Sequence, residues 1–151
     1  MPSFERLVVP RQVRTSPVSE EKRTKRDFYR ILRDYSEGNP GVALQSWRDS
    51  LYRRPDGQTI YVRLFSGPTA GQLEDLPATF YFVLRTVVQL DLAVEEDLVS
   101  CTDLSPAEVA DALRATRVHG YIDGNGHLFE IDLHWYSAII RILRRKHLLL
   151  L

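Results

Sequence analysis

The stretch LAVEEDLVSCTDLSPAEVADALRATRVHGYI, residues 92–122, decides the fold of the second half of the chain. Ser105, with Glu108 three residues later, forms a capping-box pattern that predicts the start of a helix. Pro106 suits the first helical position, where a missing backbone N–H costs nothing. The helix then carries one apolar face and is expected to end at Gly120, and that face consists of Val109, Ala112 and Leu113.

Further elements are predicted on both sides of this helix. A short helix is expected within residues 92–102, joined to it by a tight turn. Residues 79–91 predict a regular helix whose apolar face holds Phe80, Val83, Leu84, Val87 and Val88. The tetrapeptide DGNG at residues 123–126 lies between two short apolar runs and is typical of a β-hairpin turn. Residues 135–151 predict a last helix, so the expected order is helix, helix, helix, hairpin, helix.

The first third of the chain predicts two helices that pack as a hairpin. Three prolines argue against a continuous helix in residues 1–23, which are therefore expected to be a basic, extended lead-in. Residues 24–54 predict one helix that ends at Gly38 and a second that Asn39 caps. The second helix is expected to bury a stripe made of Ala43, Leu44, Trp47 and Leu51. Residues 55–78 predict a strand and then a linker loop.

Two helices alone cannot bury both of their apolar stripes in a dry core, because so small a unit is rarely stable by itself. The prediction is therefore that Trp47 packs against the helix that carries Phe80, Leu84 and Val88. The whole chain would then share one continuous core.

The order of elements over residues 79–151 resembles a winged helix, which is a helix-turn-helix with a hairpin appended. The bend Gly38-Asn39-Pro40 and the following VALQSW of residues 42–47 extend this resemblance to the C-terminal end of initiator-type, origin-recognition-like AAA+ ATPases. In that family a helical lid precedes a winged helix. The resemblance implies a mainly α fold with a small β-hairpin, made of a lid-like helical hairpin at residues 24–54 and a winged helix-turn-helix domain.

The resemblance does not carry the ATPase machinery with it. Family members often place an arginine directly after Gly-Asn-Pro, where it senses the nucleotide phosphate, but this chain has Gly41 there. No G-x-x-x-x-G-K-[ST] sequence occurs, so no P-loop lysine is available to hold phosphates. The chain is therefore expected to be a non-catalytic module.

Charge is unevenly distributed although the net charge is zero. Residues 1–54 hold twelve Lys and Arg against seven Asp and Glu, residues 55–132 hold four against thirteen, and residues 133–151 hold four against none. Cys101 is the single cysteine, which excludes an internal disulfide and favours a cytoplasmic setting. No run of eighteen apolar residues occurs, so no membrane segment is expected.

The helix at residues 105–119 would enter a DNA groove if the chain bound DNA, and its candidate contacts are Arg114 and Arg117. Glu108 and Asp111 lie on the same helix, off its apolar face, and would repel phosphates. The hairpin after it is also mostly acidic. These charges argue against DNA recognition through this helix.

The last helix offers a rival basic surface made of Arg141, Arg144, Arg145 and Lys146. It could contact phosphates without reading sequence. The alternative is an ordinary solvated helix end, since cations there stabilise the helix dipole without any partner. The charge pattern favours the second interpretation.

No catalytic, cofactor-binding or metal-binding residue is predicted. The four histidines form no H-x-x-x-H pair, and the Glu95-Glu96-Asp97 cluster opens a predicted helix, where acids are expected. The leading hypothesis is docking on an AAA+ ATPase core or another partner protein, and the alternative is a DNA-binding regulator that uses the last helix. A third hypothesis is self-association through the leucines at residues 148–151, which could equally complete the core.

Overall fold

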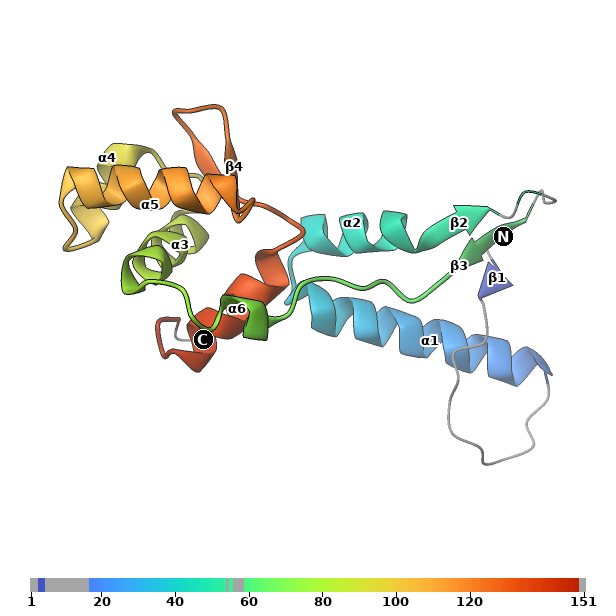
Figure 1. Ribbon diagram of the computed structural model, residues 1–151. Coiled ribbons are helices and arrows are strands. Elements are labelled where there is room, and N and C mark those ends of the chain that lie inside the picture. Colours follow the sequence, from blue (N-terminus) through green and yellow to red (C-terminus); the bar gives the residue numbers. More distant parts are fainter. Residues whose placement is uncertain (1–2, 5–16, 54, 56–58, 150–151) are drawn as a thin grey trace. The chain divides into compact units, whose positions relative to one another are not determined.

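The computed structural model describes residues 3–4, 17–53, 55 and 59–149, and the chain divides into two compact units, Met1–Ser66 and Gly67–Leu151 (Figure 1). Most of the described residues are helical, and among them two small antiparallel hairpins occur. This confirms the prediction of a mainly α fold with a small β component. Each unit has its own cluster of buried side chains, and Trp47 belongs to that of the first. The prediction that Trp47 packs against the helix at residues 79–91 joins the two units and stays a prediction.

Unit 1, Met1–Ser66, is built on the helices α1, Pro17–Ser36, and α2, Pro40–Ser50, which lie side by side (Figure 1). Gly38 takes a left-handed conformation, with φ of +82°, that lets the chain turn sharply between them. The side chain of Asn39 accepts hydrogen bonds from the backbone N–H groups of Gly41 at 2.8 Å and Val42 at 3.2 Å. The predicted cap and helical hairpin are therefore present.

The lead-in is not extended throughout, because α1 begins at Pro17, ahead of the predicted start at Thr24. A proline is compatible with the first helical position, since its missing N–H would have no partner there. The prediction of an extended lead-in over residues 1–23 is therefore wrong from Pro17 on, where α1 begins. Residues 5–16 lie outside the described part of the chain.

A three-stranded sheet completes unit 1. Strand β1, Ser3–Phe4, pairs in parallel with β3, Ile60–Val62, and β2, Leu51–Arg53, pairs antiparallel with β3. The strand predicted within residues 58–65 is thus β3. The sequence does not predict strand β2, because α2 ends at Ser50 and β2 begins at Leu51, with no turn residue between helix and strand.

The core of unit 1 is small and aromatic. Its buried residues are Phe28, Leu32 and Val62, and Ala43, Trp47, Leu51 and Phe65 pack partly buried against them. Leu44 was predicted to be buried but is 56% exposed. The buried positions of α2 are instead Val42, Ser46 and Ser50, spaced by four residues. The serines are tolerated because they are small, and the Ser50 hydroxyl donates to the Ser46 carbonyl at 2.7 Å.

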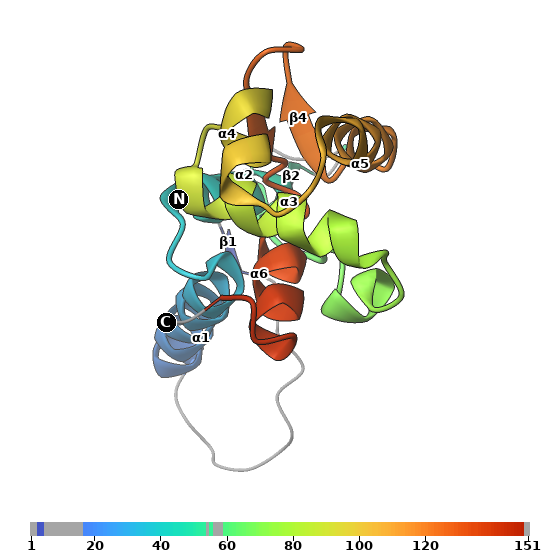
Figure 2. The same cartoon turned by 90° about the vertical axis from the view of Figure 1, so that its left-hand side faces the viewer.

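Unit 2, Gly67–Leu151, contains one 3₁₀ helix, four α-helices and one hairpin among its described residues. They are η1, Ala70–Leu73; α3, Ala78–Leu90; α4, Glu95–Cys101; α5, Pro106–Val118; β4, Ile122–Gly124; β5, Phe129–Ile131; and α6, Tyr136–Arg145. Both Figure 1 and Figure 2 show α3 between α5 and α6. The order that residues 79–151 predicted, three helices, a hairpin and a helix, is present.

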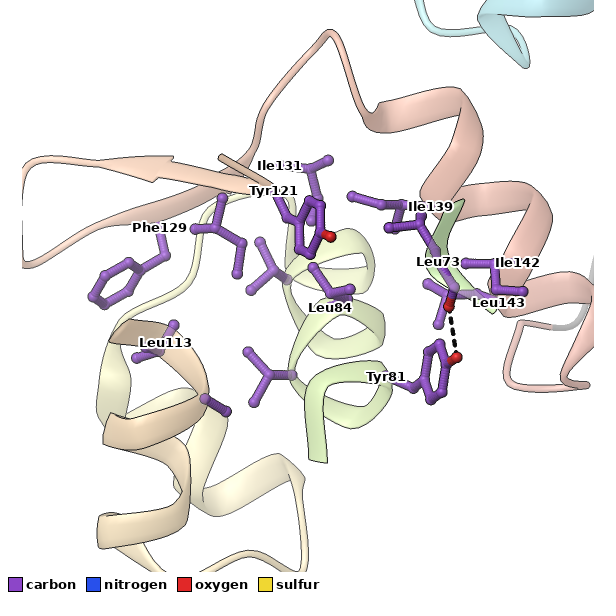
Figure 3. Packing of buried hydrophobic residues seen from close by; sticks show 14 of the residues in the cluster. Leu73, Tyr81, Leu84, Leu113, Tyr121, Phe129, Ile131, Ile139, Ile142 and Leu143 are labelled. Atoms are coloured by element: carbon purple, nitrogen blue, oxygen red, sulfur yellow. Dashed lines mark hydrogen bonds between the residues drawn. The ribbon is translucent and has the colours of Figure 1, made fainter. Parts of the chain in front are cut away.

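The core of unit 2 is large and mostly aliphatic, and it surrounds α3. Figure 3 shows Leu84 of α3 between Leu113 and Phe129 on one side and Ile139 and Leu143 on the other. Val83, Leu84 and Val87 are fully buried, as the apolar face of residues 79–91 predicted.

Two segments outside the helices α3 to α6 also contribute to this core, one of them because α6 ends at Arg145 and not at the predicted residue 151. Leu73 of η1 is fully buried, so the predicted linker loop is part of the unit. Leu148 and Leu149 pack against the same cluster from beyond the end of α6. These two leucines therefore complete the core, which is one of the two roles considered for them.

Candidate functional site

Helix α5 is the helix that was predicted to enter a DNA groove if the chain bound DNA, and the predicted capping box is present at its start. The Ser105 hydroxyl accepts from the backbone N–H of Glu108 at 3.3 Å, and the Glu108 carboxylate accepts from the backbone N–H of Ser105 at 2.8 Å. The hydroxyl of Ser105 also donates to that carboxylate, at 2.7 Å. These hydrogen bonds, the one from the Ser105 hydroxyl above all, lower the pKa of Glu108. Glu108 is therefore negatively charged at neutral pH.

The two arginines of α5 are already engaged within unit 2. Arg114 forms an ion pair with Asp111 at 3.0 Å, on the exposed surface. The guanidinium of Arg117 donates to the backbone carbonyl of Gly124 at 3.3 Å, which ties α5 to the hairpin. The exposed charged residues of α5 are therefore two acids, Glu108 and Asp111, and two arginines, so the helix surface carries no excess of positive charge.

The β4–β5 hairpin beside α5 has one position that accepts only glycine, and it exposes two acidic side chains. A side-chain carbon at Gly124 would overlap the backbone carbonyl of Leu128, so only glycine fits there. Asp123 lies directly opposite Glu130 across the two strands, and both side chains are exposed. A single bridge from Ala93 to Phe129 adds a third strand-like segment to this small sheet.

Two basic residues at the end of α6, Arg145 and Lys146, form ion pairs within unit 2. Arg145 forms an ion pair with the Glu74 carboxylate at 2.7 Å, and the Lys146 ammonium lies 3.5 Å from the same carboxylate. Lys146 also donates to the Glu74 backbone carbonyl at 3.2 Å and lies 5.1 Å from the centre of the Tyr81 ring. The Tyr81 hydroxyl in turn contacts the carbonyls of Leu73 and Glu74, at 2.6 and 2.7 Å.

We call Glu74, Tyr81, Arg145 and Lys146 the Glu74 clamp. It fastens the end of α6 to the segment before α3. The sequence offered no signal for it, because Glu74 lies 71 positions before Arg145 in a stretch predicted to be a linker. Arg145 and Lys146 thus help to hold α6 in place. This role agrees better with an ordinary helix end than with a phosphate-binding patch.

The predicted contact residues do not form one surface. Arg114 and Arg117 lie on α5, while Arg141, Arg144, Arg145 and Lys146 lie on or just after α6, and α3 runs between the two helices (Figures 1 and 2). Arg141 is exposed and Arg144 is half-buried. Any contact through α5 would therefore be separate from one through α6.

No grouping of acidic, histidine or cysteine side chains that could hold a metal ion occurs in the described part of the chain. Glu95, Glu96 and Asp97 occupy the first turn of α4, as their sequence pattern predicted. Cys101 is exposed at the end of the same helix. Within the ranges that the structure describes, no helix has the length and apolar character needed to cross a bilayer.

Comparison of the chain with known proteins gives no relative from which a function could be transferred. No family model, curated protein or solved structure matches it.

Proposed function

We propose that the chain is a non-catalytic docking module, with unit 2 as a winged helix and unit 1 as a lid-like helical hairpin, of the kind found at the C-terminal end of AAA+ ATPases. Its partner is an AAA+ ATPase core or another protein. The proposal combines the resemblance of the sequence with the charge of the α5 surface. The chain itself contributes no P-loop and no phosphate-sensing arginine to this role.

The connections within unit 2 support the winged-helix part of the proposal. Helices α4 and α5 follow one another across a short turn, and the β4–β5 hairpin comes directly after α5. The bridge from Ala93 to Phe129 joins the segment between α3 and α4 to that hairpin. This arrangement is compact and places the outer face of α5 and the hairpin at the surface.

The observation that carries the docking role is the composition of the exposed face of α5. Its two arginines are engaged by Asp111 and by the Gly124 carbonyl, and Glu108 adds a further negative charge. At the end of the same helix Val118 is 81% exposed. A neutral-to-acidic surface with an exposed apolar side chain suits another protein better than a polyanion.

The first experiment measures nucleotide and partner binding by calorimetry. The proposal expects no ATP binding in the micromolar range and no ATP turnover by the purified chain. It also expects the chain to bind a P-loop ATPase core encoded in the same or the neighbouring reading frame. Val118→Glu should weaken that binding, while Val99→Ala, on the half-buried side of α4, should leave it unchanged. Micromolar ATP binding by the chain alone would rule out the non-catalytic role.

The alternative is a DNA-binding regulator that uses α6, and the observation that favours it is the absence of any acidic residue from residues 133–151. It expects binding of duplex DNA that falls steeply with salt. Arg145→Glu should then weaken binding, but this change also breaks the Glu74 clamp. Glu74→Gln is the matched control, because it breaks the ion pairs of Arg145 and Lys146 but keeps both positive charges. Stronger DNA binding by Glu74→Gln would favour the alternative, whereas absence of wild-type DNA binding would leave the docking role.

A further inference from the structure

Unit 1 exposes an aromatic face with a basic border. Tyr29 of α1 stacks on Trp47 of α2, with ring centroids 5.6 Å apart and an interplanar angle of 23°. Tyr29 remains 44% exposed, and Leu44, one turn before Trp47, is 56% exposed. Tyr29 and Trp47 thus meet at the surface of unit 1, and the exposed side chain of Leu44 lies one helical turn away on α2. Such a contiguous group is more informative than single exposed leucines, which are ordinary.

The border of this face is basic and contains no acid. Arg26 and Arg33 flank Tyr29 at helical spacing on α1, and Arg48 lies four residues after Leu44 on α2. All three arginines are exposed, and no ion pair involves them among the residues that the structure describes. No acidic residue occupies a position three or four residues from Tyr29 or Leu44. The aromatic face, defined as Tyr29, Leu44 and Trp47 with these arginines, therefore suits an acidic apolar surface.

Unit 2 carries a surface of that description on its small sheet. Ala93 and Phe129 are paired and buried, so their neighbours Leu92 and Leu128 point to the opposite side, where they are 53% and 43% exposed. Asp123 and Glu130 form an exposed cross-strand pair on that same side. Two like charges directly opposite each other are unfavourable unless a cation lies nearby. We call Leu92, Leu128, Asp123 and Glu130 the outer sheet face.

Arg117, which is hydrogen-bonded to the hairpin, does not neutralise this pair. The Arg117 guanidinium donates to the Gly124 carbonyl rather than to either carboxylate. No ion pair of Asp123 or Glu130 occurs among the described residues. A partner that brought arginines to the outer sheet face would remove the repulsion and cover both leucines.

The net charges of the two units are equal and opposite. Met1–Ser66 holds thirteen Lys and Arg against eight Asp and Glu, a net charge of +5. Gly67–Leu151 holds seven against twelve, a net charge of −5. The chain therefore supplies both halves of a complementary contact.

We propose that the aromatic face of one copy docks on the outer sheet face of a second copy, so that the protein self-associates through unlike surfaces. The arginines lie against Asp123 and Glu130, and the Tyr29–Trp47 stack and Leu44 cover Leu92 and Leu128. This contact is independent of the docking role of α5 and does not use the C-terminal leucines. Because the two surfaces differ, two copies can exchange contacts in a closed dimer or extend into a longer assembly.

The test is sedimentation velocity of the full chain over a range of concentrations. Association is expected at about 50 mM NaCl and should be reduced at about 500 mM, because screening shortens the range of the charge–charge attraction. Arg33→Glu with Arg48→Glu, and separately Asp123→Arg with Glu130→Arg, should each raise the dissociation constant by about tenfold or more. A wild-type chain that stays monomeric at all concentrations overturns the proposal.

Mixing the two double variants gives the decisive result. In each variant alone both faces carry the same sign of charge and repel each other. In an equimolar mixture the acidic faces of one variant meet the basic faces of the other, so association should return to that of the wild type. Arg30→Glu with Arg53→Glu is the matched control, since it removes the same charge from unit 1 outside the aromatic face. Failure of the mixture to recover, or an equal loss in the control, would mean that net charge and not these two faces drives association.

Discussion

The two units bury their side chains in different ways. Unit 2 encloses long aliphatic residues from five helices and a hairpin, and Leu84, Leu98, Ile139, Ile142 and Leu143 are all fully buried. Among the described residues of unit 1, the buried apolar cluster has three members, and aromatic rings pack around it. The ring of Phe28 meets Trp47 at 5.5 Å and Phe65 at 5.9 Å, both in edge-to-face geometry. A core that depends on one ring has less redundancy than a core of many interlocking leucines.

This difference predicts that the units respond separately to damage, and it can be measured with one native tryptophan in each. Trp47 reports on unit 1, and Trp135 reports on unit 2. Each can be observed alone after the other is replaced by phenylalanine. Urea denaturation followed by tryptophan fluorescence then gives a free energy of unfolding for each unit.

The largest effect is expected for Phe28→Ala in unit 1. Loss of a buried phenylalanine costs about 3–5 kcal/mol, which is comparable with the whole stability of a small unit. The Trp47 signal of the Trp135→Phe background should therefore show an unfolded unit 1 even without urea. Phe28→Leu, which keeps an apolar side chain in place, should retain a transition. A Phe28→Ala shift below about 1 kcal/mol would contradict the assignment of Phe28 as the centre of this core.

Truncation of a buried side chain in unit 2 should lower the free energy of unfolding strongly without unfolding the unit. Leu84→Ala is expected to cost about 2–5 kcal/mol, because it leaves a cavity beside α3. The larger core should keep unit 2 folded, with a lower urea midpoint of the Trp135 signal in the Trp47→Phe background. Leu90→Ala is the control on the same helix, since Leu90 is exposed, and should change the free energy by no more than about 0.5 kcal/mol. Equal costs for the two variants would show that burial on α3 does not decide stability.

A smaller effect is expected from the Glu74 clamp. Both partners of its ion pair are more than one third exposed, so the pair contributes less than about 1 kcal/mol after screening by solvent. Glu74→Gln should lower the free energy of unfolding of unit 2 by that amount in low salt and by less in high salt. Asp75→Asn removes a neighbouring exposed charge and should have no such effect. A loss that does not diminish with salt would mean that packing rather than charge holds the clamp.

The smallest effect concerns pH and the capping box of α5. Hydrogen bonds from Ser105 lower the pKa of Glu108 in the folded state, so the ionised form stabilises folding. This contribution is fully present above the ordinary glutamate pKa of about 4.3 and is lost as the pH falls through the lowered value. The difference in unfolding free energy between wild type and Glu108→Gln should therefore shrink as the solution is acidified. A difference that is the same at neutral and acid pH would contradict this link.

Local patterns were enough to place the ends of several helices and the hairpin of unit 2. Asn39 and Ser105 accept the backbone hydrogen bonds that their positions predicted, because a cap involves only residues within one turn. The apolar face of α3 was also predicted correctly, since a strongly periodic helix leaves few choices for its buried side. The docking role of α5 and the winged-helix resemblance remain predictions.

Errors arose where neighbours far along the chain decide the outcome. Leu44 was expected to be buried on periodicity alone, but the buried side of α2 holds Val42, Ser46 and Ser50. Strand β2 exists because β3 offers a partner, and nothing within Leu51–Arg53 distinguishes it from the end of a helix. Both outcomes depend on contacts with residues elsewhere in the chain, so the local sequence of one segment does not predict them.

By itself the sequence determined the number and order of the α-helices in unit 2, the capped starts of α2 and α5, and the uneven distribution of charge. Each of these depends on residues a few positions apart or on composition. Only the tertiary structure decided that the buried residues divide into two clusters, that Glu74 joins Arg145 across 71 positions, and that Asp123 lies opposite Glu130 with both side chains exposed. The physical reason is that hydrogen bonds between near neighbours determine whether a segment forms a helix or a strand. Burial and charge pairing depend instead on which distant part of the chain packs against that segment.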